Sequence, residues 1–165
     1  MSYFLPATLH ARLKAAWWGT RDLCDGAPTL SALVERIFLT YVTHVELEHN
    51  GGAPFPPAPR GAQGPRGSAS ADHRLVAYYL PADLHARIKA TWWALRNART
   101  PALSSVVETL FTEAAAELEA AHNDGAPFPP APDSARGVSR AAASRQGEWM
   151  RREWETRRGG NPPQD

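Results

Sequence analysis

Apolar side chains recur at intervals of three and four residues in two stretches near the start of the chain. The first stretch contains Leu9, Leu13, Ala16 and Trp17, and the second contains Leu30, Leu33, Val34, Ile37, Phe38, Tyr41 and Val45. This spacing places them on one face of a helix, so it predicts one helix of about twelve residues followed by a longer one. Thr29 is typical of an N-cap, and Asn50-Gly51 is typical of a left-handed C-terminal cap.

A strand-like pattern precedes the helical ones. Residues 74–80 are rich in β-branched and aromatic side chains and end at Pro81, which favours a strand followed by a helix with proline in its first turn. At the start of the chain the corresponding run covers only residues 2–5. Side chains alternate between the two faces of a strand. The inward positions are therefore expected to be Tyr3, Leu5, Val76, Tyr78 and Leu80.

The chain also repeats itself. Residues 3–18 return as residues 78–93 with 12 of 16 positions identical, and the second helical stripe returns as Leu103, Val106, Val107, Leu110, Phe111, Ala114 and Leu118. Ten of the seventeen residues from Gly51 to Gly67 are Gly or Pro, a composition typical of a linker. We therefore expect four segments: a first repeat over 1–59, a Gly/Pro-rich linker over 60–74, a second repeat over 75–132 and a tail over 133–165.

One strand and two helices bury too little apolar surface to be stable alone, and both strand edges would be unpaired. Pairing with the other repeat of the same chain satisfies both needs. The expected fold is therefore mainly α: a two-stranded antiparallel β-ribbon with four helices, formed as an intrachain pseudo-dimer, and a helical or disordered tail.

Each repeat resembles a ribbon-helix-helix unit, the DNA-binding fold of Arc and MetJ. The Leu-Pro-Ala-Asp-Leu-His-Ala-Arg start at 80–87, the Leu-Ser-x-x-Val-Glu opening at 103–108 and the Pro-Phe-Pro-Pro at 127–130 are also similar to plasmid centromere-binding proteins of the ParB type. The resemblance covers residues 2–59 and 75–132. It implies that the ribbon lies in the major groove of double-stranded DNA, with outward side chains on the base edges.

The outward positions on the ribbon are expected to be Ser2, Phe4, Leu75, Ala77 and Tyr79. Members of that family usually carry Arg, Lys, Thr, Asn or Gln there. In this chain only the hydroxyls of Ser2 and Tyr79 could form hydrogen bonds with bases. Strong bidentate recognition of guanine is therefore not expected, and aromatic or methyl contact with thymine stays open.

The resemblance also implies that the start of the second helix of each repeat faces a DNA phosphate, where Ser31 and Ser104 would allow close approach. The first helices add positive charge through Arg12, Lys14, Arg87 and Lys89. Residues 1–59 nevertheless contain four basic and five acidic side chains, and residues 75–132 contain four and six. Phosphate attraction by the repeats alone is expected to be weak.

The tail has the opposite charge, with seven Arg against three Glu over residues 134–158. The residues singled out there are Trp149, Arg151, Arg152, Trp154, Arg157 and Arg158. Three interpretations stay open: a solvated segment, a nucleic-acid contact, and a docking segment for a protein such as a partition ATPase.

Other chemistry is poorly supported. One tryptophan of each Trp-Trp pair is expected in the core, His10 and His85 lack a second metal ligand at suitable spacing, and Cys24 lacks a partner base. The Pro-Phe-Pro-Pro segments are expected to pack back on the helices. No catalytic residue, metal or cofactor is expected.

Two classes of function therefore remain. The first is a DNA-binding protein, either a transcriptional repressor or a plasmid partition protein. The second is a non-catalytic interaction module or antitoxin-like adaptor that keeps the fold without base recognition. With a single cysteine and a net charge of +1, a cytoplasmic protein with no membrane partner is expected, associated with the nucleoid if it binds DNA. Higher oligomers along DNA stay open.

Overall fold

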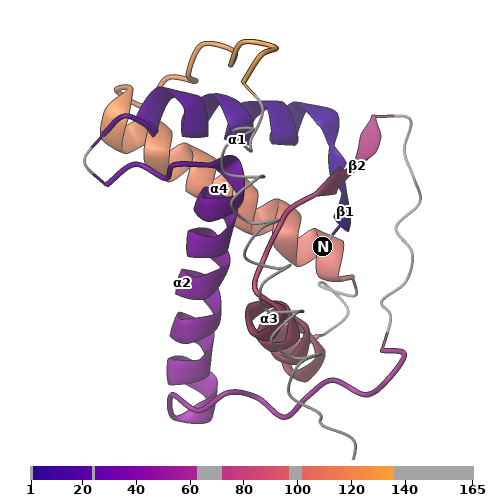
Figure 1. Ribbon diagram of the computed structural model, residues 1–165. Coiled ribbons are helices and arrows are strands. Elements are labelled where there is room, and N and C mark those ends of the chain that lie inside the picture. Colours follow the sequence, from indigo (N-terminus) through magenta and orange to yellow (C-terminus); the bar gives the residue numbers. More distant parts are fainter. Residues whose placement is uncertain (1, 24, 63–71, 97–101, 136–165) are drawn as a thin grey trace, which may run out of the picture. The chain divides into compact units, whose positions relative to one another are not determined.

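The computed structural model describes residues 2–23, 25–62, 72–96 and 102–135. These residues form four helices and a two-stranded antiparallel sheet (Figure 1). In chain order the elements are β1 (Ser2–Pro6), α1 (Ala7–Thr20), α2 (Leu30–Asn50), β2 (His73–Ala77), α3 (Ala82–Leu95) and α4 (Leu103–His122). The mainly helical architecture expected from the sequence is confirmed.

The two strands pair within the chain, with Ser2 opposite Ala77 and Phe4 opposite Leu75. Strand β2 begins at His73, inside the segment predicted as linker, and ends at Ala77 rather than at residue 80. The shorter strand follows from the register: since Ala77 lies opposite Ser2, positions 78–80 have no partner among the described residues of β1.

Helices α1 and α3 follow Pro6 and Pro81, whose fixed φ suits the start of a helix, and each is fourteen residues long. Only Trp17 and Trp92 of the two Trp-Trp pairs are buried. Trp18 and Trp93 are half-buried and stack under guanidinium groups, with Arg21 and Arg96 each 3.2 Å from the ring centroid. The expected division of each pair between core and surface is confirmed.

The longer helices are capped differently. The Thr29 side chain accepts a hydrogen bond from the Ala32 amide at 3.0 Å, and Gly51 takes the left-handed conformation with φ of 61° at the other end of α2. Both cap predictions for α2 are confirmed. Helix α4 begins after Ala102, whose side chain cannot cap it.

The Pro-Phe-Pro-Pro segments turn back at the ends of α2 and α4. The side-chain Nδ2 of Asn50 donates to the backbone carbonyls of Ala53 and Pro54, and Nδ2 of Asn123 repeats this arrangement in the second copy. The Phe128 ring then packs on Gly19 of α1, where an added Cβ would lie 2.3 Å from the ring. The packing role predicted for this motif is confirmed for Phe128.

The core is shared by both repeats. A chain of aromatic contacts runs from Tyr3 through Phe38 and Phe111 to Tyr78, with ring centroids 5.9, 5.6 and 5.7 Å apart. Aromatic pairs at such distances are favourable beyond the area they bury. Since Tyr3 and Phe38 belong to one repeat and Phe111 and Tyr78 to the other, neither repeat completes this core alone. In the described part of the chain, no helix is both long enough and apolar enough to cross a membrane.

Candidate nucleic-acid interface

The outer face of the β1–β2 ribbon is exposed. Phe4, Leu75 and Tyr79 are 51%, 60% and 61% exposed, and Ser2 and Ala77 are exposed as well. On the inner face, Tyr3, Leu5, Val76 and Tyr78 are buried. The predicted assignment of side chains to the two faces is therefore confirmed, including half-buried Leu80, which packs against the core.

The exposed face has small residues at its centre. Ser2 pairs with Ala77, and the repeat offset of 75 carries Ser2 onto Ala77, so the pseudo-twofold axis passes through this pair. Phe4 lies beside Leu75 on one side of the pair, and Tyr79 follows Ala77 on the other. At the five outward positions only the hydroxyls of Ser2 and Tyr79 are polar, and His73, the next residue on this side of β2, is half-buried beside Glu108.

The first turn of α2 lies beside the end of the ribbon. The Ser31 hydroxyl accepts a hydrogen bond from the Tyr79 amide at 3.3 Å. Ser104 is half-buried at the corresponding position of α4. The first turns of α2 and α4 contain no acidic residue, so their partial positive charge is not cancelled locally. Both helix starts therefore have properties that suit an anion.

The basic residues predicted to contact phosphate fall into two groups. Lys14 and Lys89 are half-buried on α1 and α3. Arg12 and Arg87 instead bind the buried carboxylates of Glu119 and Glu46. Their guanidinium groups therefore already have charged partners. Phosphate contact by Arg12 and Arg87 stays a prediction.

A further basic residue, Arg74, lies on β2 and was missed by the sequence reasoning. It is the first residue of the predicted strand over 74–80 and the last of the predicted linker, and it has no counterpart in the first repeat, so the sequence pattern did not single it out as a phosphate contact. The charge of Arg74 acts on His10, whose Nδ1 lies 2.9 Å from the Tyr78 hydroxyl oxygen. Burial, together with the charges of Arg74 and Lys14, lowers the pKa of His10 to about 4. Arg74 is an exposed basic side chain on β2, and Lys14 and Arg74 both act on the His10 imidazole.

The tail residues predicted as nucleic-acid or partner contacts lie outside the described residues, as does Cys24. These tail residues are Trp149, Arg151, Arg152, Trp154, Arg157 and Arg158.

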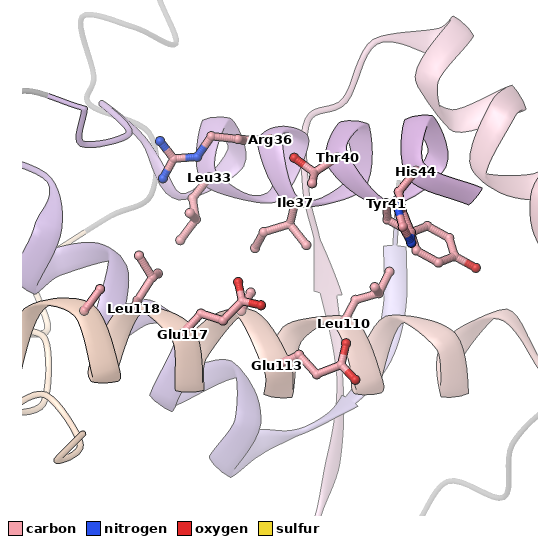
Figure 2. Close-up of a pocket in the computed structure, with 12 residues that line it drawn as sticks. Leu33, Arg36, Ile37, Thr40, Tyr41, His44, Leu110, Glu113, Glu117 and Leu118 are labelled. Atoms are coloured by element: carbon pink, nitrogen blue, oxygen red, sulfur yellow. The ribbon is translucent and has the colours of Figure 1, made fainter. Parts of the chain in front are cut away.

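A groove of about 500 Å³ lies between α2 and α4 (Figure 2). Leu33 and Ile37 point into it from α2, facing Leu110 and Leu118 of α4. Polar groups, including Arg36, His44, Glu113 and Glu117, lie around this apolar centre. Across the described ranges, no three His, Cys, Asp or Glu side chains come together in a way that could hold a metal ion. The centre of the groove is therefore apolar, and its titratable groups lie around that centre.

Comparison of this chain with protein-family models, with curated proteins and with solved structures finds no match.

Proposed function

We propose that this protein is a DNA-binding protein of the ribbon-helix-helix type, acting as a transcriptional repressor or as a plasmid partition protein. One observation carries the proposal: an antiparallel ribbon formed within a single chain presents an exposed outer face, with the start of α2 beside it at the Ser31–Tyr79 hydrogen bond. The major groove of B-form DNA is wide enough to admit a two-stranded ribbon.

The helix starts supply orientation in this proposal. Backbone N–H groups at the first turns of α2 and α4 would each approach a phosphate beside the groove, next to Ser31 and Ser104. Arg74 adds positive charge on β2, and Lys14 and Lys89 add it on α1 and α3. The arginine-rich tail adds more, and it is also the segment through which a partition ATPase or another protein would bind. The protein would act in the cytoplasm, at the nucleoid.

Fluorescence anisotropy with full-length protein tests the proposal. The probes are duplexes from the region upstream of the protein's own gene and shuffled duplexes of the same composition, each at several salt concentrations. We expect tighter binding to the upstream duplex and affinity that falls as salt rises. Absence of binding to every duplex at low salt would refute the proposal.

A larger side chain in the first turn of α4 tests whether this helix start contacts phosphate. Ser104→Gln should weaken binding to all sequences, because the larger side chain keeps a phosphate away from the first turn of α4. The matched control is Thr112→Gln, on the exposed surface of the same helix, which should bind like wild type. Equal affinity for both variants would exclude the start of α4 from the interface.

A second candidate is the non-catalytic interaction module, favoured by the apolar character of the outer ribbon face. Without DNA, Phe4 and Leu75 would bind another protein surface, and the simplest partner is the ribbon of a second copy. Analytical ultracentrifugation distinguishes the two functions. A dimer that fails to bind DNA and is lost in Leu75→Ser would favour this second function.

A further inference from the structure

The outer face of the ribbon gathers large apolar side chains. Among the described residues, six large hydrophobic side chains are exposed, and three of them, Phe4, Leu75 and Tyr79, lie on this face. The other three are Leu23, Leu39 and Leu47. None of the five outward positions carries an Arg, Lys, Asn or Gln side chain. The face is therefore unsuited to recognition of bases by hydrogen bonds.

In the major groove, most features of the base edges are hydrogen-bond donors and acceptors. Covering these with Phe or Leu removes their water without replacing its hydrogen bonds, which is unfavourable. The exception is the methyl group at C5 of thymine, which is apolar and faces the major groove. The same methyl group occurs on 5-methylcytosine. Contact between apolar side chains and such a methyl group is favourable.

We infer that the ribbon recognises the C5 methyl groups of pyrimidines in the major groove, through Phe4 and Leu75 on one side of its centre and Tyr79 on the other. This inference rests on the proposed DNA-binding function. It assigns the sequence preference to apolar contact, with the hydroxyls of Ser2 and Tyr79 as the only hydrogen-bonding side-chain groups at the five outward positions.

The ribbon geometry also sets a spacing. Phe4 lies two residues beyond Ser2, and Tyr79 lies two residues beyond Ala77 in the opposite direction. At about 3.4 Å per extended residue, Phe4 lies roughly 7 Å from the centre of the ribbon along β1, and Tyr79 follows the end of β2 on the other side of the centre. The small Ser2–Ala77 pair between them makes no large contact. We therefore expect two separate methyl-bearing positions, one on each side of the point that the Ser2–Ala77 pair faces, with weak preference between them.

Alternating synthetic DNA tests the inference without knowledge of the natural site. Full-length protein is titrated at low salt with poly(dA-dT) and with poly(dA-dU), which differ in the C5 methyl group and keep the same base pairing. Poly(dG-dC) and poly(dG-m5dC) form the second pair of probes and show whether 5-methylcytosine serves as well as thymine. We expect the methylated polymer of a pair to bind more tightly by about fourfold for each contacted methyl group.

Variants separate direct contact from an effect of the methyl group on DNA shape. Phe4→Ser and Leu75→Ser should reduce the preference for methylated DNA, because both side chains are exposed and can change without loss of the fold. Leu47→Ser is the matched control: Leu47 is 68% exposed on α2. This control should keep the full preference, and circular dichroism checks that all three variants are folded.

The outcomes are distinct. Tight binding with equal affinity for methylated and unmethylated polymers would overturn the inference and leave the DNA-binding proposal standing. A preference that survives in both ribbon variants would also overturn it, because the DNA shape would then be the cause. Absence of binding to all four polymers would overturn the proposed function and the inference together.

Discussion

Arg12 of α1 and Glu119 of α4 form a bidentate ion pair between the two repeats. The Arg12 Nε donates to Oε1 of Glu119 at 2.9 Å, and Nη2 donates to Oε2 at 2.5 Å. Arg87 and Glu46 repeat the arrangement, at 3.2 and 2.6 Å. Each pair joins the first helix of one repeat to the second helix of the other. The pairs therefore connect the two halves of the intrachain dimer directly.

Removal of Arg12 alone should lower the stability of the folded protein. Hydrogen bonds from Arg12 lower the pKa of Glu119, so the carboxylate is charged at neutral pH. Arg12→Ala would leave this charge buried and unpaired, and we expect the free energy of unfolding to fall by about 2–3 kcal/mol. The value is below that of a fully buried pair because the Arg12 side chain is 36% exposed. Urea denaturation measures it.

Two further variants support that test. Glu117→Ala, on the exposed side of the same helix, should stay within about 0.5 kcal/mol of wild type. Arg12→Met combined with Glu119→Leu should recover most of the loss, since no unpaired charge remains. If Arg12→Ala were as stable as wild type, the pair would make no net contribution.

The stability should also depend on pH through His10. Its pKa is lowered to about 4 in the folded protein, first by burial and then by Arg74 and Lys14. Between pH 6.5 and 4 the unfolded chain therefore binds a proton that the folded protein does not, and stability falls as pH decreases through this range. Urea midpoints at pH 7 and pH 5 should differ more for wild type than for His10→Gln. The exposed His44→Gln is the control.

Much of the fold follows from local patterns. Apolar periodicity predicted all four helices, and two-residue alternation assigned Tyr3 and Phe4 to opposite faces of the ribbon. Both patterns depend only on neighbouring positions and on one face being buried. The repeat then added the pairing of the strands, because a second copy was the only evident partner for each strand within the chain.

The sequence could not predict which helices would pack together. Arg12 and Glu119 are 107 residues apart, and nothing local distinguishes Arg12 from an exposed cation. The sequence therefore predicts phosphate contact for Arg12 and Arg87, which stays a prediction, and does not reveal their carboxylate partners. The side-chain hydrogen bonds of Asn50 to the carbonyls of Ala53 and Pro54 were also missed, since Asn-Gly was interpreted only as a backbone cap.

The contact between Gly19 and Phe128 allows a test of the Pro-Phe-Pro-Pro motif. Replacement of a helical glycine by alanine ordinarily stabilises a helix by about 1 kcal/mol. Here the new Cβ would lie 2.3 Å from the Phe128 ring, which must move away. Gly19→Ala should therefore give little or no gain in wild type and the full gain in a Phe128→Ala background. Thermal denaturation of the four proteins gives the coupling, and equal gains in both backgrounds would argue against packing.

The shared core predicts cooperative unfolding. Phe111 is fully buried and contacts Phe38 of the other repeat, so Phe111→Ala should lower the free energy of unfolding by about 3–5 kcal/mol. Leu84→Ala should cost about 2–5 kcal/mol. Fluorescence of Trp17 and of Trp92, each observed in a variant whose other five tryptophans are replaced by Phe, should report the same midpoint. Two separate midpoints would show that the repeats fold independently.

The last prediction concerns the tail and the salt dependence of DNA binding. The structure places Ala135 in the core, 3% exposed, with its amide bonded to the Pro132 carbonyl. Truncation should therefore follow Ala135 rather than Pro132. Because residues 134–158 carry seven Arg against three Glu and the repeats are slightly acidic, we expect the tail to supply most phosphate contacts. Each lost contact reduces the slope of log affinity against log salt by about 0.9.

The truncated protein should therefore show a slope flatter by about two to four units, while its relative preference among duplexes persists. A full-length variant with Arg151, Arg152, Arg157 and Arg158 replaced by Gln is the matched control, since it removes charge without removing chain. It should reproduce most of the change in slope. If truncation left the slope unchanged and lowered affinity for one sequence only, the tail would contribute to base recognition instead. The phosphate contacts would then have to come from basic residues of the repeats, such as Lys14, Arg74 and Lys89.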